Sequence, residues 1–287
     1  MGTCIAIVSN RAFLKRALRT ILELRIFGRY RGDVALVIGN DLVNDFAKIR
    51  KTFLDIKVYY FPDIDRTLEN SLIQNARGNS GTEISKVFQY HKLHLFSLCF
   101  KRWDQLLCLD AGMRIFRPLK PIFELDVAGS LIAHSDVFPK SSGSLFSQFN
   151  LIDFPDTKEK IDTLKIATDD YFQSGFMYFD TNLIEANTKD ILLNLMRAFP
   201  NSKTNDQGIL NLWALKTGIW KKLPTSRFGN HYIYDYWERE SRSPREYIML
   251  KYPCNLTLLR RIIRRALFES YWTLQRLVWT LRPNQSK

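Results

Sequence analysis

Short apolar runs alternate with helical apolar patterns through the first sixty residues of the chain. The short runs, each followed by turn residues, predict strands over residues 4–8, 34–38 and 57–61. Between them, apolar spacings of three and four predict helices over residues 13–24 and 42–53. Strands separated by helices favour a parallel sheet with right-handed crossovers. The turn Ser9-Asn10-Arg11 lacks a G-x-G-x-x-G motif, so a dinucleotide-binding Rossmann site is not expected.

The same alternation continues to about residue 216. It predicts strands over residues 106–110, 130–134 and 172–179, and helices over 85–100, 184–199 and 209–216. Gly175 inside a strand indicates a close approach by another group. Residues 66–83 are expected to form a loop, and residues 135–165 an excursion over the active face. We therefore predict an α/β domain over residues 1–257, with one mainly parallel central sheet flanked by helices.

Residues 258–287 follow a different pattern, and residues 258–281 predict a basic amphipathic helix. One predicted face carries the aliphatic residues Leu258, Leu259, Ile262, Ile263, Ala266, Leu267, Leu274, Leu277, Val278 and Leu281, and the other carries Arg260, Arg261, Arg264, Arg265 and Arg276. Tyr271, Trp272 and Trp279 add aromatic rings of the kind found at membrane interfaces. Two interpretations remain open: the helix lies on an anionic membrane surface, or it docks on the core.

The chain is strongly basic, with a net charge of +13 and a pI of about 9.6. This charge favours an anionic partner such as nucleotide phosphates or an anionic membrane, although a basic surface can also serve solubility alone. Nucleic acid is not the expected partner, because the basic residues are spread out rather than interleaved with stacking aromatics.

The cysteines and the N-terminus indicate a reducing compartment. None of the four cysteines forms a C-x-x-C pair, and the four histidines lack zinc-site spacing. The N-terminal apolar run is too short for a signal peptide, and no run of about 18 apolar residues predicts a membrane span. We expect a cytoplasmic protein, associated with the inner face of a membrane if the C-terminal helix binds lipid.

The candidate chemistry starts at Asp110, at the carboxyl end of the apolar strand 106–110. In open α/β sheets, ligands bind at the carboxyl ends of strands. A second carboxylate two positions later would create a metal-binding pair, but Gly112 stands there. Asp110 alone can hold a ribose or a metal, or it can be an ordinary turn residue.

Four segments together give a resemblance: Lys92-Leu93-His94, Leu109-Asp110-Ala111-Gly112, Asp170 to Gly175, and Asp206-Gln207-Gly208-Ile209-Leu210-Asn211. In order and content they resemble the GT-A-fold nucleotide-sugar transferases. The nearest resemblance is to the retaining family that includes glycogenin and bacterial lipopolysaccharide glycosyltransferases, glycosyltransferase family 8. It extends over roughly residues 3–235. It implies transfer of a hexose, with retention, from a nucleotide-diphosphate sugar, expected to be a UDP-sugar, to a hydroxyl group of a glycan, lipid-linked or protein acceptor.

The resemblance also implies roles for individual residues. It places Lys92 on the donor phosphate or sugar, Asp110 on ribose and metal, Asp206 and Gln207 beside the transferred sugar, Gln173 and Ser174 on sugar hydroxyls, and Ser9 and Arg11 near the nucleotide base. Simpler roles remain open: Lys92 can be a solvated helix residue, and Asn205 or Asp206 can cap the helix that follows.

Two departures from the family concern the metal site. Gly112 replaces the second Asp of the Asp-x-Asp motif, and Lys251 stands where the family has a late His ligand. One hypothesis is metal-independent transfer, with Lys251, Lys92 or Arg114 neutralising the diphosphate. Another is that Asp110, with Asp136 or His231, forms an altered Mn²⁺ or Mg²⁺ site. The alternative function is a degenerate transferase fold that binds a sugar nucleotide or a partner without turnover.

Overall fold

A computed structural model describes residues 2–63, 71–72, 87–138, 143–235, 243–251 and 258–281, with the backbone alone for 279–281. The strands are β1 (Thr3–Val8), β2 (Val34–Ile38), β3 (Ile56–Tyr60), β4 (Gln105–Asp110), β5 (Arg114–Ile115), β6 (Leu131–Ser135), β7 (Phe172–Asp180), β8 (Trp220–Lys222), β9 (Tyr232–Asp235) and β10 (Tyr247–Leu250). The α-helices are α1 (Arg11–Ile26), α2 (Phe46–Arg50), α5 (Lys120–Phe123), α6 (Asp156–Asp162), α7 (Thr188–Ala198), α8 (Asp206–Thr217) and α9 (Leu258–Leu281). The 3₁₀ helices are η1 (Asn40–Asp45), η2 (Phe88–Phe96), η3 (Leu98–Arg102), η4 (Leu145–Gln148), η5 (Thr181–Leu183) and η6 (Pro244–Glu246).

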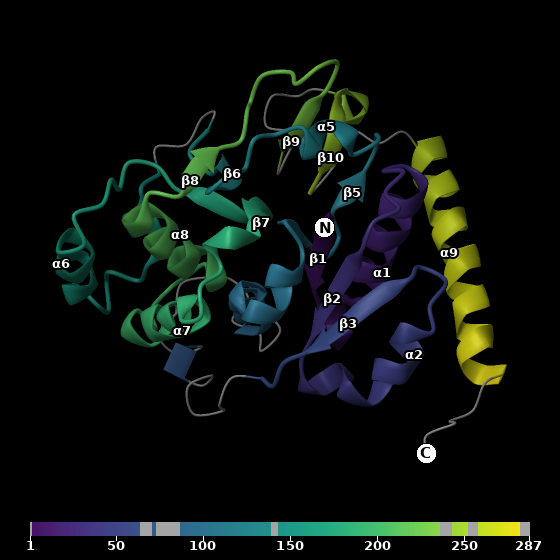
Figure 1. The fold of residues 1–287 in the computed structure, drawn as a ribbon, viewed down its shortest axis with the longest axis horizontal. Helices are drawn as coiled ribbons and strands as arrows, with labels where there is room; N and C mark the ends of the chain where they lie inside the picture. The colour runs from purple at the N-terminus through teal and green to yellow at the C-terminus, as the bar shows by residue number, and fades with distance from the viewer. Residues whose placement is uncertain are drawn as a thin grey trace.

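A seven-stranded sheet in the order β3-β2-β1-β4-β7-β6-β8 crosses the molecule (Figure 1). β7 runs antiparallel to both of its neighbours, and every other pair of neighbours is parallel. The mainly parallel sheet predicted from the sequence is therefore confirmed. A smaller sheet, β5-β10-β9, stands beside it.

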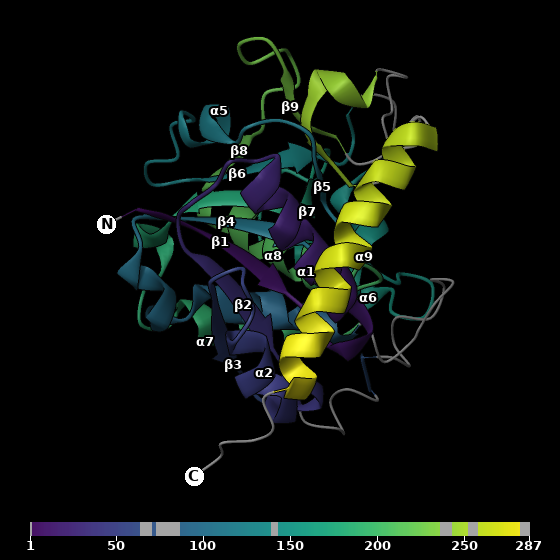
Figure 2. The same cartoon turned by 90° about the vertical axis from the view of Figure 1, so that its right-hand side faces the viewer.

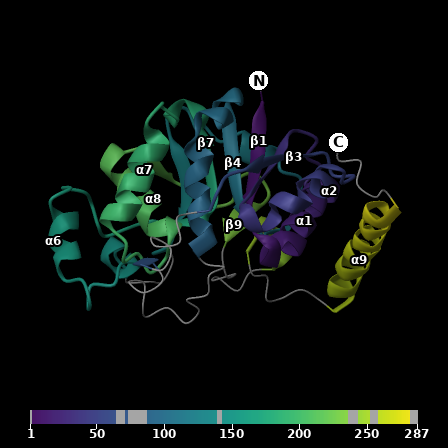
Figure 3. The same cartoon turned by 90° about the horizontal axis from the view of Figure 1, so that it is seen from below.

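The central strands bury alternate residues on the two faces of the sheet. In β1, Cys4 and Ala6 belong to a core that includes η2, α7 and α8, whereas Ile5 and Ile7 belong to a core that includes α1. This is the side-chain alternation of a strand covered on both faces, and it explains why these strands are uninterrupted apolar runs in the sequence. Viewed from below, the helices lie on both sides of the sheet (Figure 3).

Two predicted helices are wound differently from expectation. The predicted helix 42–53 is the 3₁₀ helix η1 followed by the short α2, and the described part of the predicted helix 85–100 is chiefly the 3₁₀ helix η2. η2 buries most of its side chains on all sides, so its apolar pattern carries no 3.6-residue period from which winding could be inferred. The predicted loop 66–83 lies outside the described residues, apart from 71–72.

Helix α9 runs along the outside of the molecule beside α1 (Figure 2). Its contacts show which face is docked. Phe268 is 5% exposed and Gln275 is fully buried, and Tyr271 and Trp272 pack against the α1 core. Seven large aliphatic side chains point away and are 42–74% exposed: Leu258, Leu259, Ile262, Ile263, Leu267, Leu274 and Leu277. The helix docks on the core, but not through the aliphatic face. None of the described helices has the length and hydropathy of a membrane span.

Candidate functional site

Asp110 ends β4 at the middle of the large sheet. Its register partner on the parallel strand β1 is Val8, so Asp110 lies beside the turn that contains Ser9. On its other side, the antiparallel strand β7 passes close to the carboxylate. A Cβ atom on Gly175 would lie 3.1 Å from Asp110 Oδ2. The close approach predicted at Gly175 is confirmed, and it is the Asp110 carboxylate that needs the space.

Lys92 reaches this carboxylate from η2. Its Nζ lies 2.7 Å from Asp110 Oδ1 and 3.2 Å from Asp206 Oδ2, and it donates to the main-chain oxygen and Oγ of Ser174. The side chain is only 6% exposed. The interpretation of Lys92 as a solvated helix residue is therefore wrong, because its ammonium group is buried between two carboxylates.

Lys251 reaches the same carboxylate from the end of β10. Its Nζ lies 2.9 Å from Asp110 Oδ2 and 3.3 Å from the main-chain oxygen of Ala111. Its side chain is also almost fully buried, at 8% exposure. The four charged groups form a row, Lys251–Asp110–Lys92–Asp206, with two positive and two negative charges.

Burial and the neighbouring charges shift the pKa values in this row. Burial alone would raise the pKa of Asp110, but Lys251 and Lys92 outweigh it and hold that pKa well below its usual range. Burial would lower the pKa of Lys92, but Asp110 and Asp206 raise it. At Asp206 burial dominates, and its pKa is raised despite the attraction of Lys92. The row is thus firmly charged at Asp110 and Lys92, and the anion is least favourable at Asp206.

Asp206 is the first residue of α8, and it does not cap that helix. The N-cap position belongs to Asn205, which has φ 54° and no side-chain hydrogen bond to the helix N–H groups. A positive φ is unfavourable for a residue with a side chain, so this backbone is strained. The capping role considered for Asn205 and Asp206 is therefore wrong. The strained turn instead directs Asp206 inward, where it is 1% exposed and Lys92 Nζ lies 3.2 Å from its Oδ2.

Two polar side chains and one main-chain N–H bind Gln207, the second residue of α8. Its Nε2 donates to Gln148 Oε1 at 2.9 Å and to Asp136 Oδ2 at 3.3 Å, and its Oε1 accepts the Ser174 N–H at 3.2 Å. Gln173 Nε2 donates to the other oxygen of Asp136 at 2.7 Å. These hydrogen bonds fix Gln173 and Gln207 on one carboxylate, so the two amides that the sequence suggested as sugar contacts are held side by side.

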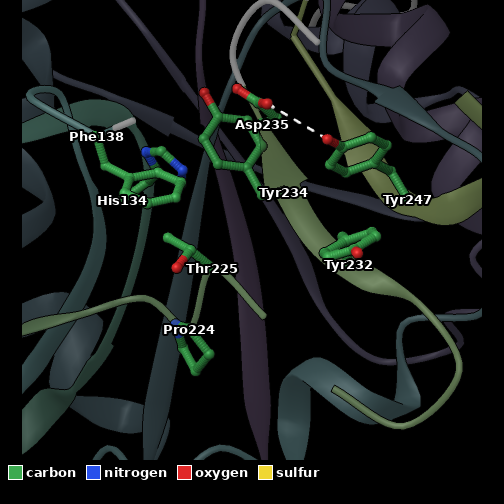
Figure 4. Close-up of a pocket in the computed structure, with 8 residues that line it drawn as sticks. All are labelled: His134, Phe138, Pro224, Thr225, Tyr232, Tyr234, Asp235 and Tyr247. Carbon is green, nitrogen blue, oxygen red and sulfur yellow. Dashed lines mark hydrogen bonds between the residues drawn. The ribbon is translucent and has the colours of Figure 1, made fainter. Parts of the chain in front are cut away.

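A shallow recess with a volume of about 10 Å³, partly open to solvent, adjoins this network (Figure 4). It is lined by His134, Phe138, Pro224, Thr225, Tyr232, Tyr234, Asp235 and Tyr247. Tyr234 connects it to the site, because its hydroxyl donates to Gln173 Oε1 at 3.2 Å. Lys251 N–H donates to the main-chain oxygen of Asp235, so the recess also borders the strand end that carries the second lysine.

Two residues expected near a nucleotide base have local roles in the structure. Ser9 is buried, and its hydroxyl donates to the main-chain oxygen of Asn10. Arg11 begins α1 and is 60% exposed, with its guanidinium 2.6 Å from Asp45 Oδ2 and hydrogen-bonded to the Asp41 main chain. Ser9 lies next to Asp110, whereas the Arg11 side chain is engaged with η1.

Two further candidates lie apart from the charged row. Arg114 binds Glu23, with its guanidinium nitrogens 2.7 to 3.1 Å from the carboxylate oxygens. His231 precedes β9, whereas Lys251 hydrogen-bonds to Asp235 at the other end of that strand. At roughly 3.3 Å per strand residue, these ends are about 13 Å apart. Burial, and then the positive charges of Arg117 and Arg227, lower the pKa of His231.

The groups around Asp110 do not fit a divalent cation. Both of its carboxylate oxygens contact lysine ammonium groups, and Gly112 contributes no side chain. Gly112 has φ 98°, a backbone conformation that favours glycine, and its N–H donates to Thr20 Oγ1. No cluster of three or more His, Cys, Asp or Glu side chains suited to a metal occurs within the described ranges. A hard cation needs several oxygen ligands, and here the neighbouring charges are positive.

Two residues of the site had no signal in the sequence. Gln148 comes from η4, within the polar excursion 135–165, and Tyr234 comes from β9, where its alternation with buried residues looks like ordinary strand packing. Gln148 and Tyr234 belong to chain segments far away in sequence, and their polar side-chain atoms contact Gln207 and Gln173. Only the fold brings them together.

Comparisons with known proteins agree with this architecture. The profile of Glycosyl transferase family 8 matches residues 34–248, which is more than half of the chain. The solved structure of the galactosyltransferase LgtC in complex with donor and acceptor sugar analogues is similar, with a TM-score of 0.56 and 12% sequence identity over 95% of both chains. A comparison with curated protein sequences gives no match.

Two longer proteins contain a similar domain. The bifunctional glycosyltransferase WbbM in its apo form has a TM-score of 0.55 and 15% identity, over 88% of this chain and 45% of its own. The glycosyltransferase GlyE of Streptococcus pneumoniae has a TM-score of 0.55 and 13% identity, over 99% of this chain and 66% of its own. This chain is therefore shorter than both, and at these identities the likeness establishes the shared GT-A fold.

The match over residues 34–248 defines the class of the protein as a glycosyltransferase, of the kind that uses nucleotide sugars in general. More particularly, the chain belongs to glycosyl transferase family 8.

Proposed function

We propose that the protein transfers a hexose from a UDP-sugar to a hydroxyl acceptor, with retention at the anomeric carbon, and without a divalent metal. The observation that carries the metal-independent part is the contact of Lys251 Nζ with Asp110 Oδ2 at 2.9 Å. It places a positive charge where the family resemblance expects the metal. Asp110 holds Lys251 and Lys92 on its two oxygens, so the lysines are positioned before the donor arrives.

The chemistry needs positive charge at this place. When the bond between the anomeric carbon and the diphosphate oxygen breaks, its electron pair stays with the diphosphate, and negative charge grows there. Preorganised cations in a buried site stabilise such charge strongly. Lys92 and Lys251 are both less than a tenth exposed, so little water screens them.

The opposite charge grows on the sugar. The raised pKa of Asp206 reflects a carboxylate that burial makes costly, and a cationic anomeric carbon or sugar hydroxyls would relieve that cost. Gln207 and Gln173, fixed on Asp136, offer amide groups to the sugar hydroxyls or to the acceptor. In this proposal Asp206 and Gln207 are the catalytic pair, and Gln173, Ser174, Ser9 and Asp110 contribute to donor binding.

The test is a turnover assay with a panel of UDP-sugars, with and without chelator. We expect turnover to be unchanged by EDTA and not stimulated by Mn²⁺. Lys251→Ala should reduce kcat by about 10² to 10³, the usual cost of removing one such electrostatic group. Lys158→Ala on the exposed α6 removes the same charge far from the row and should leave kcat unchanged.

Two outcomes would contradict parts of this proposal. Stimulation by Mn²⁺ that EDTA abolishes would overturn metal independence and leave glycosyl transfer intact. Binding of UDP-sugars without transfer or hydrolysis, for every donor tested, would favour a degenerate protein that binds sugar nucleotides without turnover.

We also propose that α9 holds the protein on the cytoplasmic face of an anionic membrane. The supporting observation is the direction of its two faces. One face of α9 packs against α1, and the seven exposed aliphatic residues point outward. Three arginines of the same helix are also exposed: Arg261, Arg265 and Arg276. A helix with an apolar outer face and flanking arginines suits the interface of an anionic bilayer. A lipid-linked acceptor would then be presented at that surface.

A further inference from the structure

A second recess, with a volume of about 210 Å³ and open to solvent, lies between α9 and the body of the protein. Its lining combines four arginines with three apolar side chains: Arg117, Arg245, Arg260, Arg264, Phe27, Phe116 and Ile263. We call it the arginine pocket. None of its residues belongs to the charged row or to the amide network of the catalytic site.

Arg264 forms the fixed floor of the arginine pocket. Its guanidinium lies 4.3 Å from the ring centre of Phe27 and 4.4 Å from that of Phe116, between two aromatic rings. It also contacts Glu23 Oε2 at 2.9 Å and donates to the main-chain oxygen of Ile115 at 2.7 Å. An arginine stacked and hydrogen-bonded in this way is rigid, so the pocket is largely preformed.

The arginines around the pocket exceed the carboxylates that contact them. Glu23 is 4% exposed and binds both Arg264 and Arg114, so one carboxylate compensates the charge of two guanidinium groups. For Arg117, Arg245 and Arg260, the described part of the chain offers no carboxylate contact. Their mutual repulsion is evident at Arg260, where burial and then Arg245 and Arg117 lower the pKa.

The geometry points to a phosphate-bearing lipid as the ligand, and we propose that the arginine pocket binds the phosphate group of an anionic membrane lipid. Guanidinium groups bind phosphate oxygens in pairs, so a phosphate held by Arg245 and Arg260 would relieve the repulsion among the three arginines. Arg117 is fixed beside them, because its Nε and Nη2 donate to the main-chain oxygen of Arg245. Phe27, Phe116 and Ile263 give the first methylene groups of the lipid an apolar wall. Ile263 also belongs to the outward aliphatic face of α9, so the pocket opens next to the surface proposed to meet the bilayer.

This inference deepens the membrane attachment proposed for α9, and it can be tested apart from that attachment. The probes are dihexanoyl phosphatidate, dihexanoyl phosphatidylcholine and inorganic phosphate, each at the same concentration below micelle formation. The measurement is the melting temperature of the full chain, which rises when a ligand binds the folded state. The variant is Arg245→Gln/Arg260→Gln, and the matched control is Arg261→Gln/Arg265→Gln, which removes the same charge from exposed positions of α9.

We expect dihexanoyl phosphatidate to raise the melting temperature of the wild type and of the control by about 2 °C or more. The pocket variant should lose most of this shift, and the phosphatidylcholine should produce none. An equal shift with inorganic phosphate would show a simple anion site and overturn the assignment to a lipid. Equal shifts in variant and wild type, or no shift at all, would overturn the pocket itself. If the wild type shows the shift but fails to bind anionic vesicles, the pocket stands and the membrane attachment through α9 fails.

Discussion

At the scale of single residues, the site is governed by burial. Lys92, Asp110, Asp206 and Lys251 are charged groups that a stable core would avoid, and each is tolerated because a group of opposite charge lies 2.7 to 3.2 Å away. Breaking such a row leaves an uncompensated buried charge, which is costly. The direction of each pKa shift shows where neighbouring charges fail to compensate the burial of a charged group. The pKa of Asp206 is raised, so its carboxylate is the least compensated of the four groups.

This imbalance predicts a separation of activity from stability at Asp206. Asp206→Asn keeps the side-chain shape and removes an anion that its surroundings disfavour, while Lys92 retains Asp110. We expect kcat to fall at least 100-fold, with a melting temperature equal to or above that of the wild type. Steady-state kinetics and calorimetry measure the two effects. Asp162→Asn on the exposed α6 is the control and should change neither. A variant that unfolds at lower temperature would show that Asp206 is structural.

At the scale of elements, the 3₁₀ helix η2 buries Lys92 and His91 and partly buries His94. Side chains three residues apart lie over one another in this winding, and the rings of His91 and His94 are 5.3 Å apart. The His94 ring also stacks on Phe61 at 4.4 Å. Burial, with help from His91 and Lys189, lowers the pKa of His94 to about 3. The element that positions Lys92 therefore depends on a neutral histidine.

The lowered pKa of His94 predicts a loss of stability in acid. Below pH 6.5 the unfolded chain binds a proton at His94 that the folded protein does not bind until about pH 3. The free energy of unfolding should then fall by about 1.4 kcal/mol per pH unit as the pH is lowered through this range. Urea titrations at pH 8, 6 and 5 measure it. His94→Gln should remove this part of the slope, and a variant with the wild-type slope would contradict the assignment.

At the scale of the whole molecule, the net charge of +13 and the outward face of α9 act together. Two ion pairs, Lys15–Glu269 and Arg264–Glu23, join the docked face of α9 to α1. Gln275 joins it to the turn after α2, because its side-chain oxygen accepts the Phe53 N–H. Helix α9 is therefore fixed to the rest of the protein, so the whole protein docks on any membrane surface that α9 binds.

We expect the full chain to co-sediment with phosphatidylglycerol vesicles and not with phosphatidylcholine vesicles, and to dissociate as salt rises, because screening weakens surface charge. Leu267→Glu/Leu274→Glu places two carboxylates on the outward face and should weaken binding at least tenfold. Ile152→Glu/Ile191→Glu makes the same change at exposed positions away from α9 and should bind like the wild type. If both double variants bind the vesicles equally well, the outward face of α9 is not the membrane contact.

The positions of Asp110 and Gly175 could be predicted from the sequence, because they stand at a recognisable strand end and within a recognisable strand. Asp110 after an apolar strand and Gly175 within one were sufficient to indicate a ligand edge and a close approach. The winding of η2 could not be predicted, because a segment buried on all sides has no amphipathic period. Neither could the roles of Gln148 and Tyr234, since each reaches the amide network only through a hydrogen bond to a residue 59 or 61 positions away in sequence.

The sequence by itself determined the order of six strands of the large sheet and of the longer helices, the carboxylate at the end of β4, and the basic amphipathic character of the last helix, because these depend on local periodicity and composition. The small sheet of β5, β10 and β9 was not predicted from it. Only the tertiary structure decided that Lys92 and Lys251 share Asp110, that Asp206 faces inward from a strained turn, and that α9 docks through its aromatic and Arg264 side. These arrangements depend on which buried surfaces and charges compensate one another across the fold, and a linear pattern does not contain that information.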